Sequence, residues 1–331
     1  MEKDINITNE SDELLRIEDL YVEYRSGGGV AKAVNGLNLT INRGEALGLV
    51  GESGAGKTTT AYSIMQLLPS KVGFITKGDI LFCGESLLIK NDKELDILRG
   101  KRISMVFSNP LTSLNPVFTV GEQIAMGLRK HNRLDKKEAA KATKKLLEQV
   151  GILPYRLNDY PYQFSGGMRQ RVGIAAALAC SPELLIADEP TTALDVTIQA
   201  QIMELMKNLQ REYSTSFIMI THNLGIIAEL CKQVAVMYGG EIVEYGTIRE
   251  VFQNPSHWYT YGLLHAVPNL KGNRKEKLES IRGLVANSRN LPQGCKFHPR
   301  CPHCVDKCKT ESPKLAKITD NHSAACWNKG E

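Results

Sequence analysis

No stretch of this 331-residue sequence approaches the ~18 to 20 uninterrupted apolar residues that a membrane-spanning helix needs. An internal repeat, a heptad run and a low-complexity segment are also missing. The composition, 42% hydrophobic and 23% charged, excludes a disordered, collagenous or fibrous chain. The first 15 residues carry acidic side chains and lack an apolar signal-peptide core, so we expect the chain to stay in the cytosol.

The charged residues form no dense block of one sign. The formal net charge is +5, and the positive excess lies in residues 263–331. Such a basic end fits a solvated surface as well as contact with nucleic acid or anionic lipid. The 8 cysteines are not expected to form disulfides in a reducing compartment, so their spacing matters more than their number.

Three short apolar runs give the strongest structural signal, at residues 46–50, 184–187 and 217–220. Runs that are apolar on both faces are typical of central strands in a parallel sheet covered by helices. We expect mainly helices between the first two runs. Other expected elements are strands over residues 14–41 broken by a turn at 26–29, an amphipathic helix over 136–150, and a hairpin over 234–245.

A phosphate-binding motif follows the first apolar run. Residues 51–58 read GESGAGKT and match G-x-x-x-x-G-K-[ST] between a strand and a plausible helix. Glycines let successive backbone N–H groups converge on phosphate oxygens at a helix N-terminus. Lys57 adds positive charge toward the β and γ phosphates, and the Thr58 hydroxyl can ligate Mg²⁺. The sequence therefore predicts a nucleoside triphosphate site.

An acidic pair ends the second apolar run. Phosphoryl transfer needs a metal ligand and a group that orients or deprotonates water. Asp188 is placed to hold Mg²⁺ through water, and Glu189 to act on the attacking water.

Further motifs then occur in a fixed order. Residues 164–168 read FSGGM before a helical run, residues 193–195 read ALD, and His222 ends the third apolar run. Together with the P-loop, they resemble the ATP-binding subunits of ABC transporters over about residues 14–262. The resemblance implies an α/β P-loop NTPase (RecA-like) core with an antiparallel β subdomain and a helical subdomain at about 111–180.

The resemblance also implies roles for single residues. Tyr24 would stack on adenine, Asp195 would link the two halves of a dimer, and His222 would contact the γ-phosphate and Glu189. Residues Ser165, Gly166 and Gly167 would contact ATP bound to the opposite subunit. The catalytic set is Glu189, His222 and Lys57, and the magnesium set is Thr58, Asp188 and Ser108. The nucleotide-binding set is Tyr24, Gly51, Glu52, Ser53, Gly54, Ala55, Gly56, Lys57, Thr58 and Thr59.

Two motifs of the nucleotide site depart from the family pattern. The ends of the FSGGM segment are usually Leu and Gln, but its Ser-Gly-Gly is intact. Ser108 stands where the family has a Gln that reaches Mg²⁺ and the attacking water. Serine is shorter and can act there only through an added water. A hydrolysis-impaired regulatory subunit therefore stays open as an alternative to an active ATPase.

Two segments, LTSLNP at 111–116 and NPSHWYT at 254–260, resemble oligopeptide/dipeptide importer ATPases, whose relatives also carry nickel or metal–chelator complexes. In that family the positions of Cys295, Cys301, Cys308 and Cys326 resemble ligands of a [4Fe–4S] cluster, and Cys304 is an extra thiol that could substitute as a ligand. From the residues alone, clustered thiols with nearby histidines leave iron–sulfur, zinc and metal-free thiols open.

The expected domains are a flexible tail (1–12), a nucleotide-binding domain (13–262) and a C-terminal Cys-rich module (263–331). One P-loop and one signature segment imply that two chains, identical or homologous, close on two ATP molecules. The resemblance implies two membrane-spanning permease subunits that dock near residues 108–120, and indirectly an extracellular substrate-binding protein. The chain would lie peripherally on the cytoplasmic side of the membrane.

Soluble ABC ATPases that act on ribosomes or DNA are the rival class. Ribosome-directed members usually carry two nucleotide domains in one chain, and DNA-repair members carry long coiled-coil insertions. Neither feature is present in this sequence, so we expect no nucleic-acid partner.

Overall fold

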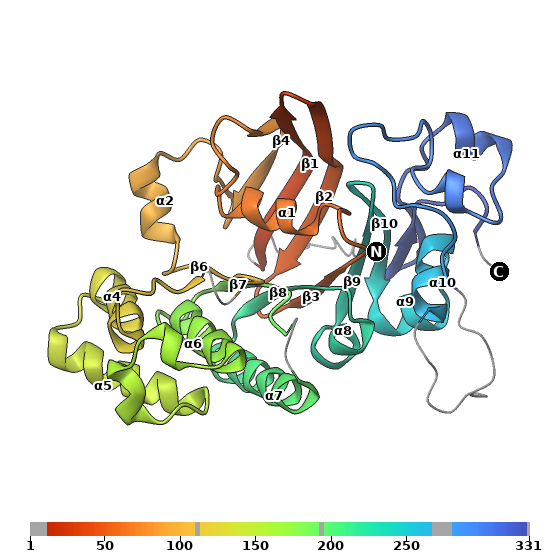
Figure 1. Cartoon of the computed structure of the whole chain (residues 1–331). Coiled ribbons are helices and arrows are strands. Elements are labelled where there is room, and N and C mark those ends of the chain that lie inside the picture. Colours follow the sequence, from red (N-terminus) through yellow and green to blue (C-terminus); the bar gives the residue numbers. More distant parts are fainter. Residues whose placement is uncertain (1–11, 110–112, 192–194, 267–279, 330–331) are drawn as a thin grey trace, which may run out of the picture.

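The computed structural model describes residues 12–109, 113–191, 195–266 and 280–329. Two β-sheets form the framework, with helices packed on them (Figure 1). Within those residues the smaller sheet has the order β2-β1-β4-β5, and the larger sheet has the order β11-β12-β10-β9-β3-β8-β7-β6. Of the expected tail, residues 1–11 lie outside the described part of the chain.

The smaller sheet is antiparallel and starts with a long hairpin. Its strands are β1 (Glu13–Ser26), β2 (Gly29–Asn42), β4 (Gly73–Phe82) and β5 (Glu85–Ser86). β1 lies between β2 and β4, and Ser26 pairs with Gly29 across the turn. The expected turn and the antiparallel β subdomain are therefore confirmed.

The larger sheet contains the parallel core. Its strands are β3 (Ala46–Val50), β6 (Ile103–Val106), β7 (Leu184–Asp188), β8 (Ser216–Thr221), β9 (Gln233–Tyr238), β10 (Glu241–Thr247), β11 (Ala316–Thr319) and β12 (His322–Ala324). β9, β3, β8, β7 and β6 run parallel, and β9 and β10 form the expected antiparallel hairpin. Every residue of β3, β7 and β8 is buried, which confirms the three expected central strands.

The stretch between the first two apolar runs is only partly helical, so the expectation of mainly helices was wrong for β4 and β6. β4 exposes polar side chains such as Thr76 and Lys77, which hides its strand pattern. β6 has only four residues, including Ser104. Pairing with β1 and β7, rather than local sequence, makes these segments strands.

The helices of the described residues include some on each face of the larger sheet. They are α1 (Lys57–Ile64), α2 (Asp92–Leu98), α4 (Val120–Asn132), α5 (Lys136–Gln149), α6 (Gly166–Leu178), α7 (Val196–Tyr213), α8 (Leu224–Leu230), α9 (Ile248–Gln253), α10 (Trp258–His265) and α11 (Asp306–Thr310), with short 3₁₀ turns η1 (Pro154–Asn158), η2 (Pro161–Gln163) and η3 (His298–Arg300). Leu47 and Leu49 of β3 pack on the α1 side, whereas Ala46 and Val50 pack on the α7 and α8 side. This alternation explains why the strand is apolar throughout.

α4, α5 and α6 enclose a separate apolar core and form the helical layer at the lower left of Figure 1. α5 confirms the expected amphipathic helix. Asp135 and Glu138 form a capping box that fixes its start. Among the described residues, no helix combines the length and the apolar character that crossing a bilayer requires.

The C-terminal segment (residues 280–329) joins the larger sheet through β11 and β12 (Figure 1). The contact is polar and buried: His322 Nε2 lies 2.6 Å from Glu244 Oε1 on β10, and the two side chains are 3% and 0% exposed. Glu244 also accepts hydrogen bonds from the backbone N–H groups of Ser256 and His257, at 2.7 and 3.0 Å. This single carboxylate therefore joins β10, the start of α10 and β12.

Replacing His322 with Ala should destabilise the chain by ~2 kcal/mol, because a buried carboxylate would lose one of its hydrogen-bonding partners. Thermal unfolding should show a midpoint lowered by several degrees. His265→Ala is the matched control, since His265 is exposed on α10 and its ring contacts a carbonyl of its own helix. Equal midpoints for the two variants would contradict the role given to Glu244.

Candidate functional site

The predicted functional residues meet at one edge of the larger sheet. β3 leads into the P-loop (residues 51–58), β6 toward Ser108, β7 into Glu189 and β8 into His222. Because these strands are parallel, their carboxyl ends lie side by side although the residues are far apart in sequence. Ligands of open α/β sheets bind outside this edge.

The P-loop has a backbone that requires glycine. Gly51, Gly54 and Gly56 have φ values of 154°, 81° and 105°. A Cβ on Gly51 or Gly56 would lie 2.2 or 2.4 Å from a neighbouring backbone carbonyl oxygen. Gly56 is also the N-cap of α1 and brings no side chain, so the N–H groups of the first helical turn can face an anion. This cradle fits a phosphate group.

Lys57 is folded back onto the loop. Its Nζ donates to the carbonyl oxygens of Gly51 and Glu52 at 2.6 and 2.9 Å. Burial lowers the pKa of Lys57, and the nearby carboxylates of Glu189, Asp188 and Glu52 oppose that shift. The two carbonyl oxygens carry only partial negative charge. A bound anion would therefore be a stronger partner for the Lys57 ammonium group.

Thr58 and Asp188 form the second part of the site. The Thr58 hydroxyl donates to Asp188 Oδ1 at 3.2 Å, across 130 residues of sequence. Asp188 is buried, and this burial raises its pKa. A hydroxyl and a carboxylate side by side are hard oxygen ligands of the kind that Mg²⁺ prefers.

Glu189 and His222 form the third part. His222 Nδ1 lies 3.3 Å from Glu189 Oε1, and the two side chains are 64% and 27% exposed. The Glu189 backbone has φ 46°, a left-handed conformation uncommon for glutamate, and its N–H donates to Ile220 O at 2.8 Å. Such strain is typical of functional sites. The pair can hold a water molecule and accept a proton from it.

Tyr24 and Ser108 lie at the margins of the site. The hydroxyl of half-buried Tyr24, on β1, donates to Thr59 Oγ1 at 3.2 Å, which places its ring beside α1. Ser108 is exposed two residues after the end of β6, and β6 pairs with β7. The structure therefore places Ser108 at the same sheet edge as Asp188.

The signature segment and Asp195 lie on other elements. Ser165 is the N-cap of α6, where its hydroxyl accepts a hydrogen bond from Met168 N at 3.4 Å, and α6 packs with α4 and α5. Asp195 caps α7 in the same way through Ile198 N at 2.9 Å. Both residues are exposed. The expected residues 193, 194 and 110–112 lie outside the described part of the chain.

Two contacts of the P-loop escaped the sequence analysis. Glu52 N donates to the hydroxyl of buried Tyr259 on α10 at 2.7 Å. The two oxygens of the Glu52 carboxylate accept hydrogen bonds from the two terminal guanidinium nitrogens of Arg300, at 2.5 and 3.1 Å. Tyr259 and Arg300 lie more than 200 residues beyond the loop, so no local spacing marks them.

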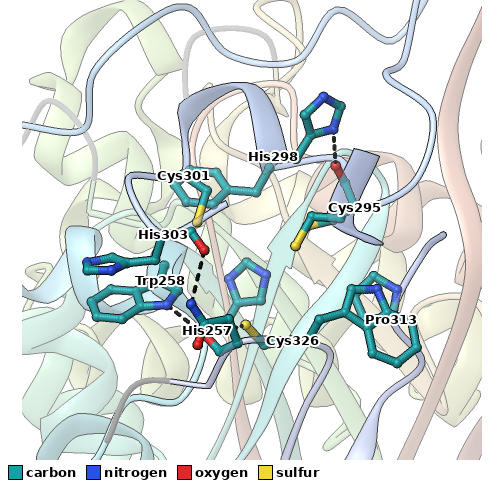
Figure 2. Close-up of a pocket in the computed structure, with 12 residues that line it drawn as sticks. His257, Trp258, Cys295, His298, Cys301, His303, Pro313 and Cys326 are labelled. Carbon is teal, nitrogen blue, oxygen red and sulfur yellow. Dashed lines mark hydrogen bonds between the residues drawn. The ribbon is translucent and has the colours of Figure 1, made fainter. Parts of the chain in front are cut away.

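Four cysteines line a pocket in the C-terminal segment (Figure 2). They are Cys295, Cys301, Cys308 and Cys326, whereas Cys304 does not belong to the lining. Figure 2 shows the labelled sulfurs of Cys295, Cys301 and Cys326 facing the same space. The structure thus brings together the four cysteines singled out in the sequence.

The nearby histidines are engaged elsewhere. The His298 ring contacts a backbone carbonyl at 2.9 Å, and the His303 ring stacks on Trp258 with centroids 3.5 Å apart (Figure 2). His257 Nδ1 accepts from Tyr259 N at 3.1 Å, and burial lowers the pKa of His257 to about 4. Thiols are therefore the main ligand set that the pocket offers. Among the described residues, no three His, Cys, Asp or Glu side chains converge on a single-ion position.

Cys308 is buried, whereas Cys295, Cys301 and Cys326 are half-buried. Burial raises the pKa of Cys295 to about 12 and that of Cys301 to about 11. The N–H groups of Phe297 and His303 donate to these two sulfurs and oppose the shift. As free thiols they stay protonated at neutral pH, so a metal would have to displace their protons. The structure establishes a four-cysteine pocket, and not a metal centre.

Sequence comparison gives two family matches. Residues 34–192 match the ABC transporter family, and residues 243–308 match the oligopeptide/dipeptide transporter C-terminal region. The oligopeptide transport ATP-binding protein OppD of Bacillus subtilis is 48% identical over 95% of this chain and 88% of its own length. The dipeptide transport ATP-binding protein DppD of the same organism is 46% identical over 96% of this chain and 95% of its own length.

Structure comparison agrees with these matches. The dimeric post-hydrolysis structure of the ATP-binding cassette MJ0796, bound to ADP and Pi, aligns with a TM-score of 0.65 and 28% identity. The match covers 71% of this chain and 99% of that cassette. The chain therefore belongs to the ABC transporter family, as one of its ATPase subunits.

Proposed function

We propose that this chain hydrolyses ATP to power the import of oligopeptides or dipeptides. The observation that carries the proposal is the common sheet edge at which the P-loop, the Thr58–Asp188 pair and the Glu189–His222 pair meet. The cargo class is inferred from relatives named as oligopeptide and dipeptide transport proteins, and from the matching C-terminal region. Import of nickel or metal–chelator complexes is the alternative cargo.

The binding step uses the loop and its lysine. Bound ATP supplies the reactive phosphoanhydride, and Mg²⁺ neutralises charge on its oxygens. The Lys57 ammonium group would leave the carbonyl oxygens of Gly51 and Glu52 and contact phosphate oxygens instead. The backbone N–H groups in the first turn of α1 would donate to the phosphate as well. Thr58 and Asp188 would provide oxygen ligands for Mg²⁺. The Tyr24 ring would stack on adenine.

The chemical step uses Glu189 and His222. Glu189 Oε accepts the proton of the attacking water, and His222 Nδ1 holds that carboxylate in place at 3.3 Å. The hydrogen bond from Glu189 N to Ile220 O maintains the strained backbone that aims this side chain. Ser108 is offered to Mg²⁺ through an intervening water.

A second ATP-binding subunit, identical or homologous, completes the site. In the single chain, solvent reaches the Glu189–His222 pair. Ser165 and Gly166, at the N-terminus of α6, are also exposed. A helix N-terminus favours an anion, so a facing chain can cover the phosphates of this one. Closure of the two ATP-binding subunits would move two membrane-spanning permease subunits. The chain would lie peripherally on the cytoplasmic side of the membrane. An extracellular substrate-binding protein would take part indirectly.

The variant Glu189→Gln should retain ATP binding and lose hydrolysis by ~100-fold or more, because the amide cannot accept a proton from water. Steady-state phosphate release and nucleotide titration measure the two properties separately. If Glu189→Gln hydrolyses ATP at the native rate, the assignment of the general base is wrong.

The variant Ser108→Gln should raise kcat about tenfold, since a longer side chain reaches the metal and the attacking water directly. The gain should disappear in the Ser108→Gln/Glu189→Gln double variant, which shows that it uses the same chemistry. A native chain that binds ATP without any turnover, restored by Ser108→Gln, would favour the hydrolysis-impaired regulatory alternative instead.

We also propose a [4Fe–4S] cluster in the four-cysteine pocket, held by Cys295, Cys301, Cys308 and Cys326. The shared pocket of four cysteines, the backbone N–H donors to Cys295 and Cys301, and the engaged histidines support an all-thiolate ligand set. Zinc is the alternative, but its ligands must converge on one ion at ~2.3 Å. The cluster would cross-link η3, α11 and the end of the chain beyond β12.

Anaerobically purified chain should contain about four iron and four sulfide per molecule and absorb visible light. Cys301→Ser should lose most of the iron and sulfide, because it removes a ligand from the pocket. Cys304→Ser is the matched control, since Cys304 lies outside the lining and its thiol contacts Val305 O at 3.5 Å. One zinc without sulfide, or no metal at all, would contradict the cluster.

A further inference from the structure

Arg300 joins the four-cysteine pocket to the P-loop. Its guanidinium contacts both carboxylate oxygens of Glu52, at 2.5 and 3.1 Å, and its side chain is only 4% exposed. The same group donates to Tyr238 OH at 3.4 Å and to Arg282 O at 2.9 Å. Arg300 is therefore fixed on several sides, and a fork of this kind holds a carboxylate in one orientation.

Glu52 needs such a partner because of where it lies. It follows Gly51 within the P-loop, and its carbonyl oxygen holds Lys57 Nζ at 2.9 Å. An unpaired carboxylate in this loop would repel a polyphosphate. Arg300 neutralises this charge and engages both of its oxygens, while the Tyr259 hydroxyl fixes the Glu52 backbone N–H at 2.7 Å.

Arg300 does not itself line the cysteine pocket, but its neighbour Cys301 does. Arg300 ends η3, and Cys301 follows it directly, with Cys301 N donating to Phe297 O at 3.1 Å. Phe297 is buried, lines the pocket and packs edge-on against Tyr238, with ring centroids 5.3 Å apart. The turn that places Cys301 in the pocket thus also places Arg300 against Glu52.

A second contact supports the same connection. Gly240, in the turn between β9 and β10, donates its N–H to Ala55 O of the P-loop at 3.1 Å. A Cβ on the adjacent Gly239 would lie 2.9 Å from Lys296 Cβ, so the residue after Cys295 packs directly on this turn. The residues that follow Cys295 and precede Cys301 therefore connect to the P-loop at two places, Ala55 through the β9–β10 turn and Glu52 through Arg300.

We propose that Arg300 is a positioning residue for ATP: by holding Glu52, it makes the ATP affinity of the P-loop depend on the integrity of the four-cysteine pocket. The inference rests on the proposed ATP site, and is independent of the cargo and of whether the pocket holds a metal. By linkage, a change in the pocket that shifts Arg300 changes nucleotide affinity, and bound nucleotide stabilises the pocket in return.

The test is a double-mutant cycle on the full chain, with Arg300→Gln, Glu52→Gln and both together. The readout is the Kd for a magnesium complex of a non-hydrolysable ATP analogue, measured by calorimetry. Arg300→Gln should raise this Kd about tenfold, and the effect should shrink to about twofold or less in the Glu52→Gln background. In steady-state hydrolysis, Arg300→Gln should raise KM more than it lowers kcat.

Controls separate positioning from folding. Arg249→Gln removes an exposed arginine whose contact is Gln253 of its own helix, and should leave the Kd unchanged. Arg300→Lys keeps the charge without the fork and should give an intermediate Kd. If thermal unfolding shows that the Arg300→Gln chain does not fold, the Arg300→Lys variant replaces it in the test. A native Kd in folded Arg300→Lys would then overturn the proposal.

A second arm tests the connection to the pocket. Cys301→Ser should also raise the Kd, and this effect should largely disappear when Arg300 is already Gln. Additive effects, or a Kd within twofold of native in folded Arg300→Gln, would overturn the inference while leaving the ATP site intact. A native chain that does not bind the analogue would overturn both.

Discussion

The parallel pairing of β3, β8, β7 and β6 determines where the reactive groups lie. Each strand is buried among helices, so its register is set by core packing rather than by the residues that follow it. A shift of one residue in β7 would turn Asp188 away from Thr58, which it now contacts at 3.2 Å. The sheet register therefore determines which side chains meet at the proposed metal-binding and water-activating positions.

This edge is maintained at a cost in stability. Burial raises the pKa of Asp188 and lowers that of Lys57, because removal from water penalises the charged form of each group. Glu189 adds a left-handed backbone at φ 46°. Both charges find only partial compensation within the chain. In the proposed function, bound nucleotide and Mg²⁺ would supply the compensating charges.

Sequence patterns predicted the P-loop, the acidic pair and the central strands because each depends on local spacing. β4 and β6 were missed because their strand character comes from pairing with β1 and β7. The contacts of Glu52 with Tyr259 and Arg300 were missed for a similar reason: they join residues more than 200 positions apart. The four cysteines were recognised by resemblance, and their shared pocket required the fold.

The exposure of the Glu189–His222 pair is consistent with a site that a second chain covers. His222 is 64% exposed, yet phosphoryl transfer is favoured in a site from which bulk water is excluded. The N-terminus of α6 lies in the helical layer, on a different element from the P-loop. The chain has an exposed helix N-terminus that suits an anion, and its own proposed phosphate site is open. The helix N-terminus of one chain is therefore complementary to the phosphate site of another. Closure of two chains would then couple nucleotide binding to movement of the helical layer, since that layer carries the covering groups.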